Sequence, residues 1–548
     1  MIEQEQEQKE SRPIRRIIRW LGAGIFAILF ILAVIFQTPW KVIALLGIFL
    51  AACTVLPRPA RKWFWLSVGA GVLALIIWFL VPADSKGWRP YTFDAESAAL
   101  EAKYAVPDEE NAALVYDEIF KTLDTDSNQP DFYMQSTPSS RNEPWLSKDH
   151  PEMAEWLKDR QDTIAKLLQA AKKDKCHYPI SPHIWDFGRR TERLAPMRKS
   201  AFLLSSAGNN DLGEGRIDAG LEKYLCIIRM ADHLYQQPAA LDFLVGSALE
   251  SVALTQLNRF VIEGRPTAEQ LQLISASIRD VKDEWGSEFQ KWLELDKLFT
   301  KNSFCLLVYE VNPQGKIRFN RNPFDTILKY AAPDEMPRLS YWQRLVFRTN
   351  TVLGWLFIPS TPQQASEILD AYFDKYSDMT RPDFEWGQKP QDFDSLITKG
   401  NFNRMKLNFS YFARFVVELS KGSYFGLHDA YLRSLAVRRG SRVLMAIKQY
   451  HTDHGTWPDS LDGIKADVPA EALIDPQNNG SFVYQLSGDT FTFYSKGKNG
   501  IDNQGRWSTT FEGDVSLPKE VEDDILFWPP RKPKAAEENA DPNLTKMD

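Results

Sequence analysis

Cysteine and histidine are scarce in this chain of 548 residues, which contains four cysteines and seven histidines. Cys53 lies in a long apolar stretch. The other three cysteines permit at most one disulfide, and none is spaced as CxxC: Cys176, Cys226 and Cys305. These numbers exclude a disulfide-held scaffold, so the fold needs a hydrophobic core.

Several common catalytic signatures are missing. The chain has no HExxH motif, P-loop, GxGxxG turn or GxSxG elbow. His451 and His454 lie beside Asp453 at a predicted helix end, and we interpret them as capping and surface residues rather than zinc ligands. Cys176, His177 and His183 have the composition of a metal or thiol cluster, but we interpret them as residues of local packing. An anion site could be formed by a group of four arginines, which we interpret as a solvated helix face: Arg189, Arg190, Arg193 and Arg198. The sequence therefore favours a protein that is not an enzyme.

Positive charge is not concentrated outside the N-terminus. The formal net charge is −7, and no basic stripe follows the first residues. A nucleic-acid-binding protein normally carries a basic face that matches the phosphate backbone. We therefore expect no nucleic acid partner.

Three long apolar stretches, residues 17–36, 40–56 and 63–82, stand near the N-terminus. Each is close to the roughly 20 residues that a helix needs to cross the hydrocarbon core of a bilayer. We therefore predict three transmembrane helices, with membrane lipid as the partner of residues 17–82. Their middle turns contain no ionisable side chain, which favours an anchor over a transporter.

The cations around these stretches predict the orientation. Four arginines between Arg12 and Arg19 precede or begin the first stretch, and a short link holding Arg58, Arg61 and Lys62 joins the second to the third. By the positive-inside rule both segments are cytoplasmic, so residues 83–548 are extracytoplasmic. A signal peptide is the alternative for the first stretch, but two further stretches follow and no small-residue cleavage site precedes Gln37.

The remaining chain is long enough for more than one core, and its apolar periodicity is mainly helical. Helices are predicted over 110–120, 150–174, 197–207, 215–235, 238–263, 267–299 and 363–378. Gly208 to Asp211 is interpreted as a breaker between two of them, giving a hairpin close to the size of one tetratricopeptide-like repeat. Cys305 to Tyr309 is compatible with a buried strand or a helix. The expected organisation begins with a basic N-terminus (1–16), a three-span anchor (17–82) and a linker (83–106). An α-helical domain (107–425), an α+β module with a small antiparallel sheet (428–526) and a disordered tail (527–548) follow.

The last part of the chain alternates turn and strand signals. A helix is expected from Asp429 to about Tyr450, with Gly455 in the left-handed conformation after it. Asp475 to Gly480 has the composition of a turn. Residues 482–486 and 490–495 are then predicted to form a β-hairpin around Ser487-Gly488-Asp489.

This order of short motifs carries a family resemblance. The motifs are Ile447 to Pro458, Asp475-Pro476, Phe482-Val483-Tyr484, and Phe493 to Gly497 running into Asn499-Gly500. Together they resemble the soluble domain of the major pseudopilin of type II secretion, the G-type subunit. The whole chain resembles uncharacterised membrane-anchored bacterial proteins with a helical region followed by this module. The resemblance implies a location in the bacterial inner (cytoplasmic) membrane, and, because residues 1–428 precede the module, its reuse as a recognition or packing domain.

The same resemblance implies a calcium-binding loop. The matching region runs from Lys498 to Gly505, and its candidate ligands are Asp502 and Asn503, with Asp524 arriving from the C-terminal segment. Calcium takes six to eight oxygen ligands from carboxylates, amides, backbone carbonyls and water. Plain solvated turn residues are the alternative.

Two functions fit these features. The first is a membrane-anchored extracytoplasmic scaffold or adaptor that binds envelope or secretion-related proteins. The alternative is an envelope hydrolase or small-ligand-binding protein with a site in the helical domain. A deep pocket with converging polar side chains favours the alternative.

Overall fold

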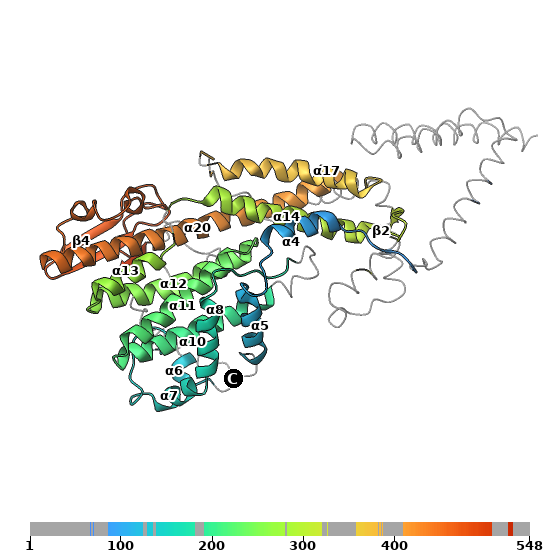
Figure 1. Ribbon diagram of the computed structural model, residues 1–548. Coiled ribbons are helices and arrows are strands. Elements are labelled where there is room, and N and C mark those ends of the chain that lie inside the picture. The colour runs from blue at the N-terminus through green and yellow to red at the C-terminus, as the bar shows by residue number, and fades with distance from the viewer. Residues whose placement is uncertain are drawn as a thin grey trace, which may run out of the picture. The chain divides into compact units, whose positions relative to one another are not determined.

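The computed structural model describes part of the chain in detail (Figure 1). Apart from a few isolated positions, the described residues are 86–123, 129–134, 139–180, 191–279, 282–320, 358–381, 409–506 and 524–529, with the backbone alone for 409–422. The three apolar stretches and residues 530–548 of the predicted tail lie outside these ranges, whereas residues 527–529 of that tail are described. The predicted transmembrane helices therefore stay predictions.

The described part is mostly α-helical, as predicted, and has two three-stranded antiparallel sheets, of which the sequence predicted only the one in the C-terminal module. Its helices are α4 (Asp94–Tyr104), α5 (Ala112–Leu123), α6 (Asp131–Met134), α7 (Pro151–Lys158), α8 (Gln161–Ala171), α10 (Leu194–Gly213), α11 (Ile217–Tyr235), α12 (Ala240–Glu263), α13 (Ala268–Ser277), α14 (Trp285–Val308), α17 (Pro362–Phe373) and α20 (Phe409–His454). The chain divides into two compact units. Unit 1 comprises Met1–Ser97, Pro182–Asp186 and Asp296–Ser423, and unit 2 comprises Ala98–Ser181, Phe187–Leu295 and Tyr424–Asp548.

Unit 1 contains the first sheet. Strands β1 (Arg89–Pro90), β2 (Tyr309–Val311) and β3 (Ile317–Phe319) pair in the order β1-β2-β3, with β2 in the middle. The first strand lies within the predicted linker, 83–106, as does helix α4, and the other two strands follow the end of α14. The alternative at Cys305 to Tyr309 is thereby settled, because helix continues to Val308 and the strand begins at Tyr309.

A buried polar cluster connects the segments of unit 1. The ammonium group of Lys301, whose side chain is 5% exposed, lies 2.6 Å from the Glu96 carboxylate and 3.4 Å from that of Asp370. The fully buried Asn302 accepts the backbone N–H of Phe93 at 2.7 Å. These bonds satisfy polar groups that would otherwise be costly to bury.

The core of unit 2 is built on α10, α11 and α12, which pack side by side (Figure 1). Their facing sides bury Leu204, Ile227, Leu254 and Leu257, among others. α5 and α8 pack against each other, and α8 also contacts α10 and α11. The predicted helices over 110–120, 215–235 and 238–263 are confirmed by α5, α11 and α12.

The predicted break at Gly208 to Asp211 is wrong, because α10 continues to Gly213. Gly208 gives space to the ring of Tyr224, which would lie 2.6 Å from a β-carbon at that position. Asn209 is fully buried and bonded to Tyr224, and Asp211 lies 2.5 Å from the ammonium group of Lys223. Tertiary contacts therefore outweigh the weak helix propensity of these residues. The turn comes later, at Gly215, whose φ is +76°.

The predicted helix over 267–299 is two helices. α13 begins with a capping box, in which the Thr267 hydroxyl accepts the N–H of Gln270 and the Gln270 side chain accepts the N–H of Thr267. It ends at Ser277, and α14 begins at Trp285. Thr267 thus starts the helix as predicted, but the helix ends earlier.

The C-terminal module has the predicted element order. Helix α20 ends at His454, and Gly455 follows with φ of +76°. Short 3-10 helices over Leu461–Ile464 and Ala470–Leu473 lead to the hairpin of β4 (Val483–Ser487) and β5 (Thr490–Ser495). The predicted hairpin is confirmed, and a third strand, β6 (Ile525–Trp528), pairs with β5.

A buried ion pair attaches α20 to α12 inside unit 2. The Arg438 Nε lies 2.8 and 2.9 Å from the two carboxylate oxygens of Glu250, and both side chains are less than 5% exposed. The Tyr235 hydroxyl donates to the same carboxylate at 2.6 Å. Burial alone lowers the pKa of Arg438, but the adjacent Glu250 outweighs it, so the pKa of Arg438 is raised and its guanidinium stays charged.

Within the described part of the chain, one helix is long and apolar enough to cross a membrane by length and composition. This helix is α12, and half of its apolar window is buried inside the protein. It also carries Glu250, paired with Arg438. These features are those of a core helix.

Candidate functional site

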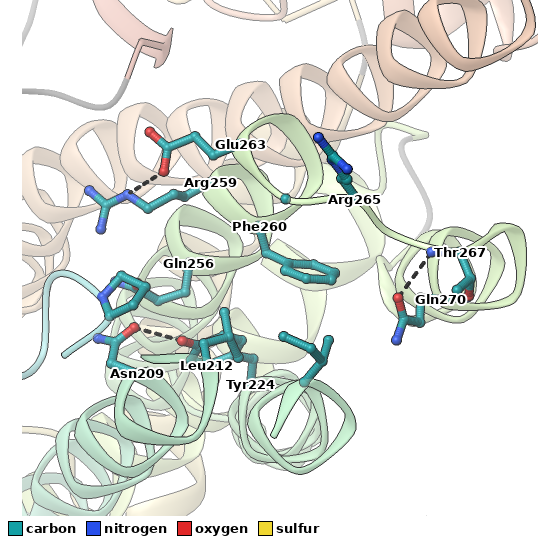
Figure 2. A pocket seen from close by; sticks show the side chains of 13 residues that line it. Asn209, Leu212, Tyr224, Gln256, Arg259, Phe260, Glu263, Arg265, Thr267 and Gln270 are labelled. Atoms are coloured by element: carbon teal, nitrogen blue, oxygen red, sulfur yellow. Dashed lines mark hydrogen bonds and ion pairs between the residues drawn. The ribbon is translucent and has the colours of Figure 1, made fainter. Parts of the chain in front are cut away.

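Unit 2 contains a pocket of about 500 Å³ at the point where four helices end or begin (Figure 2). Its lining comes from the C-terminal ends of α10 and α12, the N-terminal ends of α11 and α13, and the loop before α13. Figure 2 shows Phe260 in the middle of this lining, with Arg259 and Glu263 on one side and Thr267 and Gln270 on the other. The volume lies in the range of small-molecule sites.

The floor of the pocket is polar and internally bonded. The Tyr224 hydroxyl donates to the Asn209 side-chain oxygen at 2.6 Å, and the Asn209 amide donates to the Ser140 carbonyl at 3.0 Å. Gln256, which is 6% exposed, donates to the Arg141 carbonyl at 3.1 Å. These bonds fix the side chains before any ligand arrives, so the floor is preorganised.

Apolar side chains form a second part of the lining. Leu212, Ile217 and Phe260 contribute aliphatic and aromatic surface from three helices. Leu212 is held close to α11 because Gly220 has no side chain, and a β-carbon there would lie 2.0 Å from a Leu212 methyl group. The pocket therefore offers an apolar contact surface beside its polar floor.

The charged side chains stand on α12 and the loop that follows it. The Arg259 Nε lies 3.9 Å from the Glu263 carboxylate, and Arg259 also donates to the Asn142 carbonyl. Arg265 lines the pocket from the loop and is exposed to solvent. Two cations thus face one anion in the described lining.

The described lining is poor in the side chains that most often carry catalysis. Among the residues that form the described pocket, none is a histidine, cysteine, serine or lysine. Burial raises the pKa of Tyr224 well above its usual value, so its hydroxyl stays protonated at neutral pH. Nucleophilic and general acid–base catalysis need a nucleophile or a group that changes protonation near the working pH. Thr267, the other hydroxyl in the lining, is engaged as the cap of α13.

The comparisons with known proteins place the chain in no family. No protein-family model matches the sequence, and neither a curated protein nor a solved structure shows significant similarity to it.

The structure places Asp524, just before β6, against the loop that carries Asp502 and Asn503. Asp524, which is 2% exposed, accepts the backbone N–H groups of Asn503 at 3.0 Å and Gly505 at 2.8 Å. Asp502 accepts the Tyr494 hydroxyl at 2.8 Å and the N–H of Gln504 at 2.9 Å. Asp524, the residue before the first residue of β6, therefore holds the loop from 502 to 505 in place.

The three candidate residues supply some, but not all, of the oxygen ligands that calcium requires. The side-chain oxygen of Asn503 is buried and has no hydrogen-bond partner, as an oxygen reserved for a cation would be. The three candidates supply two carboxylates and one amide, so backbone carbonyls and water would have to complete the shell. No group of three histidine, cysteine, aspartate or glutamate side chains placed to hold a metal occurs in the described part of the chain.

The other sequence candidates that the structure describes have structural roles, while His183, Arg189 and Arg190 lie outside the described residues. His454 stacks on Tyr450 at 4.1 Å between ring centroids, and His451 lies 4.0 Å from the ring of Trp457. His177 pairs with Glu101 at 2.7 Å. The three cysteines outside the first apolar stretches are buried as free thiols, so no disulfide links them: Cys176, Cys226 and Cys305.

The arginine group does not gather into one site among the described residues. Arg193 forms a bidentate pair with Asp242, with distances of 2.9 and 2.7 Å. Arg198 is exposed on α10.

Sequence reasoning missed the pocket residues. The predicted helix start at residue 267 falls in the pocket lining, but no sequence pattern marked Arg259 or Glu263, which lie one helical turn apart on α12. Tyr224 and Asn209 came from segments assigned to a helix and to its break. Knowing that α10 continues to Gly213 was needed to place them together.

Proposed function

We propose that the protein is a non-catalytic binding protein anchored in the bacterial inner membrane, and that its helical region binds a small ligand in the pocket of unit 2. The observation that carries this proposal is the pocket itself. It combines a preorganised polar floor, an apolar wall and charged side chains at one site. Such a combination is typical of ligand sites. The anchor and the extracytoplasmic location follow from the sequence.

Binding is favoured over hydrolysis by the composition of the lining. A hydrolase needs a nucleophile, a metal or a paired acid and base at the reacting bond. The ionisable groups of the described lining are two arginines, one glutamate and a tyrosine that stays protonated. A single exposed glutamate paired with an arginine is no acid–base couple.

The test is equilibrium binding of N-phenyl-1-naphthylamine, whose fluorescence rises in apolar surroundings, to the full chain in lipid nanodiscs. Signal from empty nanodiscs is subtracted, and the saturable part is measured. Ile217→Trp places an indole in the apolar wall, and we expect it to weaken saturable binding at least about tenfold. Leu114→Trp is the matched control, because Leu114 is exposed on α5 and does not line the pocket.

Two results would contradict the proposal. The first is the absence of saturable binding to the parent protein. The second is equal binding by the parent and the Ile217→Trp variant, which would place the probe elsewhere. Far-ultraviolet circular dichroism of both variants checks that the helical fold is retained.

We propose a second function for the C-terminal module, as an adaptor surface for envelope or secretion-related proteins. The resemblance to the pseudopilin domain supports it, and so does the exposure of apolar side chains on the module. Leu486 on β4 is 40% exposed, and Ile501 in the loop is 52% exposed. Apolar side chains mark a binding surface when they form one contiguous patch, so the adaptor proposal requires both positions to contact the same partner.

Cross-linking in cells tests the adaptor function. The full chain is compared with a Leu486→Asp/Ile501→Asp variant, which keeps the Arg438–Glu250 pair that a truncation would break. We expect envelope proteins to cross-link to the parent and to be lost from the variant. Identical partner lists would contradict an adaptor role for these two positions.

Calcium binding by Asp502, Asn503 and Asp524 is a further proposal that rests on the resemblance. A bound ion would tie β6 to the loop after β5 and stabilise the module. We expect calcium to raise the unfolding temperature of the full chain and magnesium to have less effect, because magnesium requires a stricter octahedral shell. The Asn503→Ala variant should lose this effect.

A further inference from the structure

We propose that the pocket selects organic anions, with a sulfonate, carboxylate or phosphate head on an apolar or aromatic body. This inference rests on the proposed binding function of the pocket and names the chemistry of its ligand. It follows from the charges in the lining, from the helix ends that meet there and from the apolar wall.

Two arginines give the described pocket lining an excess of positive charge. Arg259 and Arg265 both line the pocket, while Glu263 is its one acidic residue among those described. The Glu263 side chain is 56% exposed, so its charge is well screened by water. Arg265 has no hydrogen bond or ion pair with the described part of the chain. Its guanidinium can therefore bind an oxyanion with two parallel hydrogen bonds.

Two helix N-termini also lie at the pocket. α11 begins at the pocket with no side-chain cap, so backbone N–H groups of its first turn are left for another acceptor. The N-terminus of α13 also meets the pocket, but its capping box already satisfies Thr267 and Gln270, so it adds no free donor. Gln270 also donates to the carboxylate of Asp218, in the first turn of α11, at 2.8 Å, and so partly offsets that negative charge. Helix N-termini favour negative charge because their N–H groups and dipoles point toward it.

The opposing helix C-termini are already neutralised by contacts. The Lys448 ammonium lies 3.3 Å from the carbonyl oxygen of Ile262 and 3.4 Å from that of Gly264, at the end of α12. At the end of α10, the Leu212 carbonyl accepts the N–H of Gly215 at 3.1 Å. The negative ends of these helices therefore repel an anion less than uncapped ends would.

The apolar wall selects the body of the ligand. Leu212, Ile217 and Phe260 form a surface that a flat or branched apolar group can cover. An inorganic anion would contact the arginines and leave this surface wet. A ligand with both parts uses the whole lining, which is the reason for proposing an organic anion.

The test compares two probes that share one ring system. 1-Anilinonaphthalene-8-sulfonate carries a sulfonate, and N-phenyl-1-naphthylamine is the same molecule without it. Both are titrated against the full chain in nanodiscs, with the parent, Arg265→Gln and Arg198→Gln. Arg198 is the matched control because it is an exposed arginine on α10 outside the lining. Arg259 is left intact, since it also bonds to the Asn142 carbonyl.

We expect the parent to bind the sulfonate at least about tenfold more tightly than the neutral probe, as one charge-assisted contact provides. Arg265→Gln should weaken sulfonate binding at least about threefold, with the neutral probe and Arg198→Gln unchanged. Equal saturable binding of both probes, or no effect of Arg265→Gln, would overturn the anion selectivity while leaving the pocket as a binding site. Saturable binding of neither probe would overturn the proposed function and this inference together.

Discussion

The Glu250–Arg438 pair gives the sharpest stability prediction. Glu250→Gln removes the negative charge that accepts the Arg438 guanidinium at 2.8 and 2.9 Å and the Tyr235 hydroxyl at 2.6 Å. The Arg438 charge then stays buried without a counterion. One of its terminal nitrogens already lacks a hydrogen-bond partner, so the site has few other acceptors to offer.

Breaking a buried pair from one side costs about 3–5 kcal/mol, because the remaining charge loses its compensation. We expect Glu250→Gln and Arg438→Met each to destabilise unit 2 by about this amount. The double variant Glu250→Met/Arg438→Met should recover most of the loss, since it removes both charges together and keeps the packing volume. The two single effects are then strongly non-additive.

Hydrogen exchange measured by mass spectrometry on the full chain in nanodiscs is the assay. It reports the free energy of local opening for peptides from α12 and from the part of α20 after Tyr424. Faster exchange in both peptides is expected for each single variant. Single effects below about 1 kcal/mol, or a double variant as unstable as the sum of the singles, would refute the reasoning.

Three further predictions concern pH, packing and the pocket. Burial, and then the neighbouring charge of Glu250, raise the pKa of Asp232 from 3.8 to about 6, so the folded state holds this proton more tightly than the unfolded chain. Ionised Asp232 therefore lowers the free energy of unfolding, and this loss is absent below pH 3.8 and complete above about pH 6. Asp232→Asn should stabilise the protein by about 2 kcal/mol at pH 8 and have little effect near pH 4, as measured by urea unfolding. Gly208→Ala should destabilise by about 1–3 kcal/mol in the same assay, because its β-carbon would lie 2.6 Å from the Tyr224 ring; an unchanged midpoint would contradict the close packing. Glu263→Gln should tighten binding of 1-anilinonaphthalene-8-sulfonate by about two- to fivefold, since an exposed charge at this distance contributes under about 1 kcal/mol; weaker binding would contradict the anion model.

Local signals predicted the parts of the fold that depend on local chemistry. The hairpin of β4 and β5 follows from alternating apolar residues around Gly488, whose φ is +59°. The start of α13 follows from Thr267 and its capping partner. In both cases neighbours in sequence supply the hydrogen bonds that define the element, so the pattern is sufficient.

Distant contacts decided the parts that the sequence did not reveal. Gly208 and Asn209 look like a helix break, yet Tyr224 and the Ser140 carbonyl hold them inside α10. Strand β6 was missed because its partner β5 is far away along the chain.

The candidate site was hidden for the same reason. Its lining joins Pro144, the end of α10 and the start of α13, which no short pattern connects. Asn503 does lie against Asp524, whose carboxylate accepts its backbone N–H, but calcium binding by Asp502, Asn503 and Asp524 stays a prediction.

The most direct test of the binding function is native mass spectrometry of the full chain, isolated in nanodiscs from the membranes in which it is produced. The parent should carry a small-molecule adduct that leaves on mild activation, and Ile217→Trp should lack it while Leu114→Trp keeps it. A parent protein without any adduct beyond lipid, or an adduct retained by Ile217→Trp, would contradict the claim that this pocket holds a ligand.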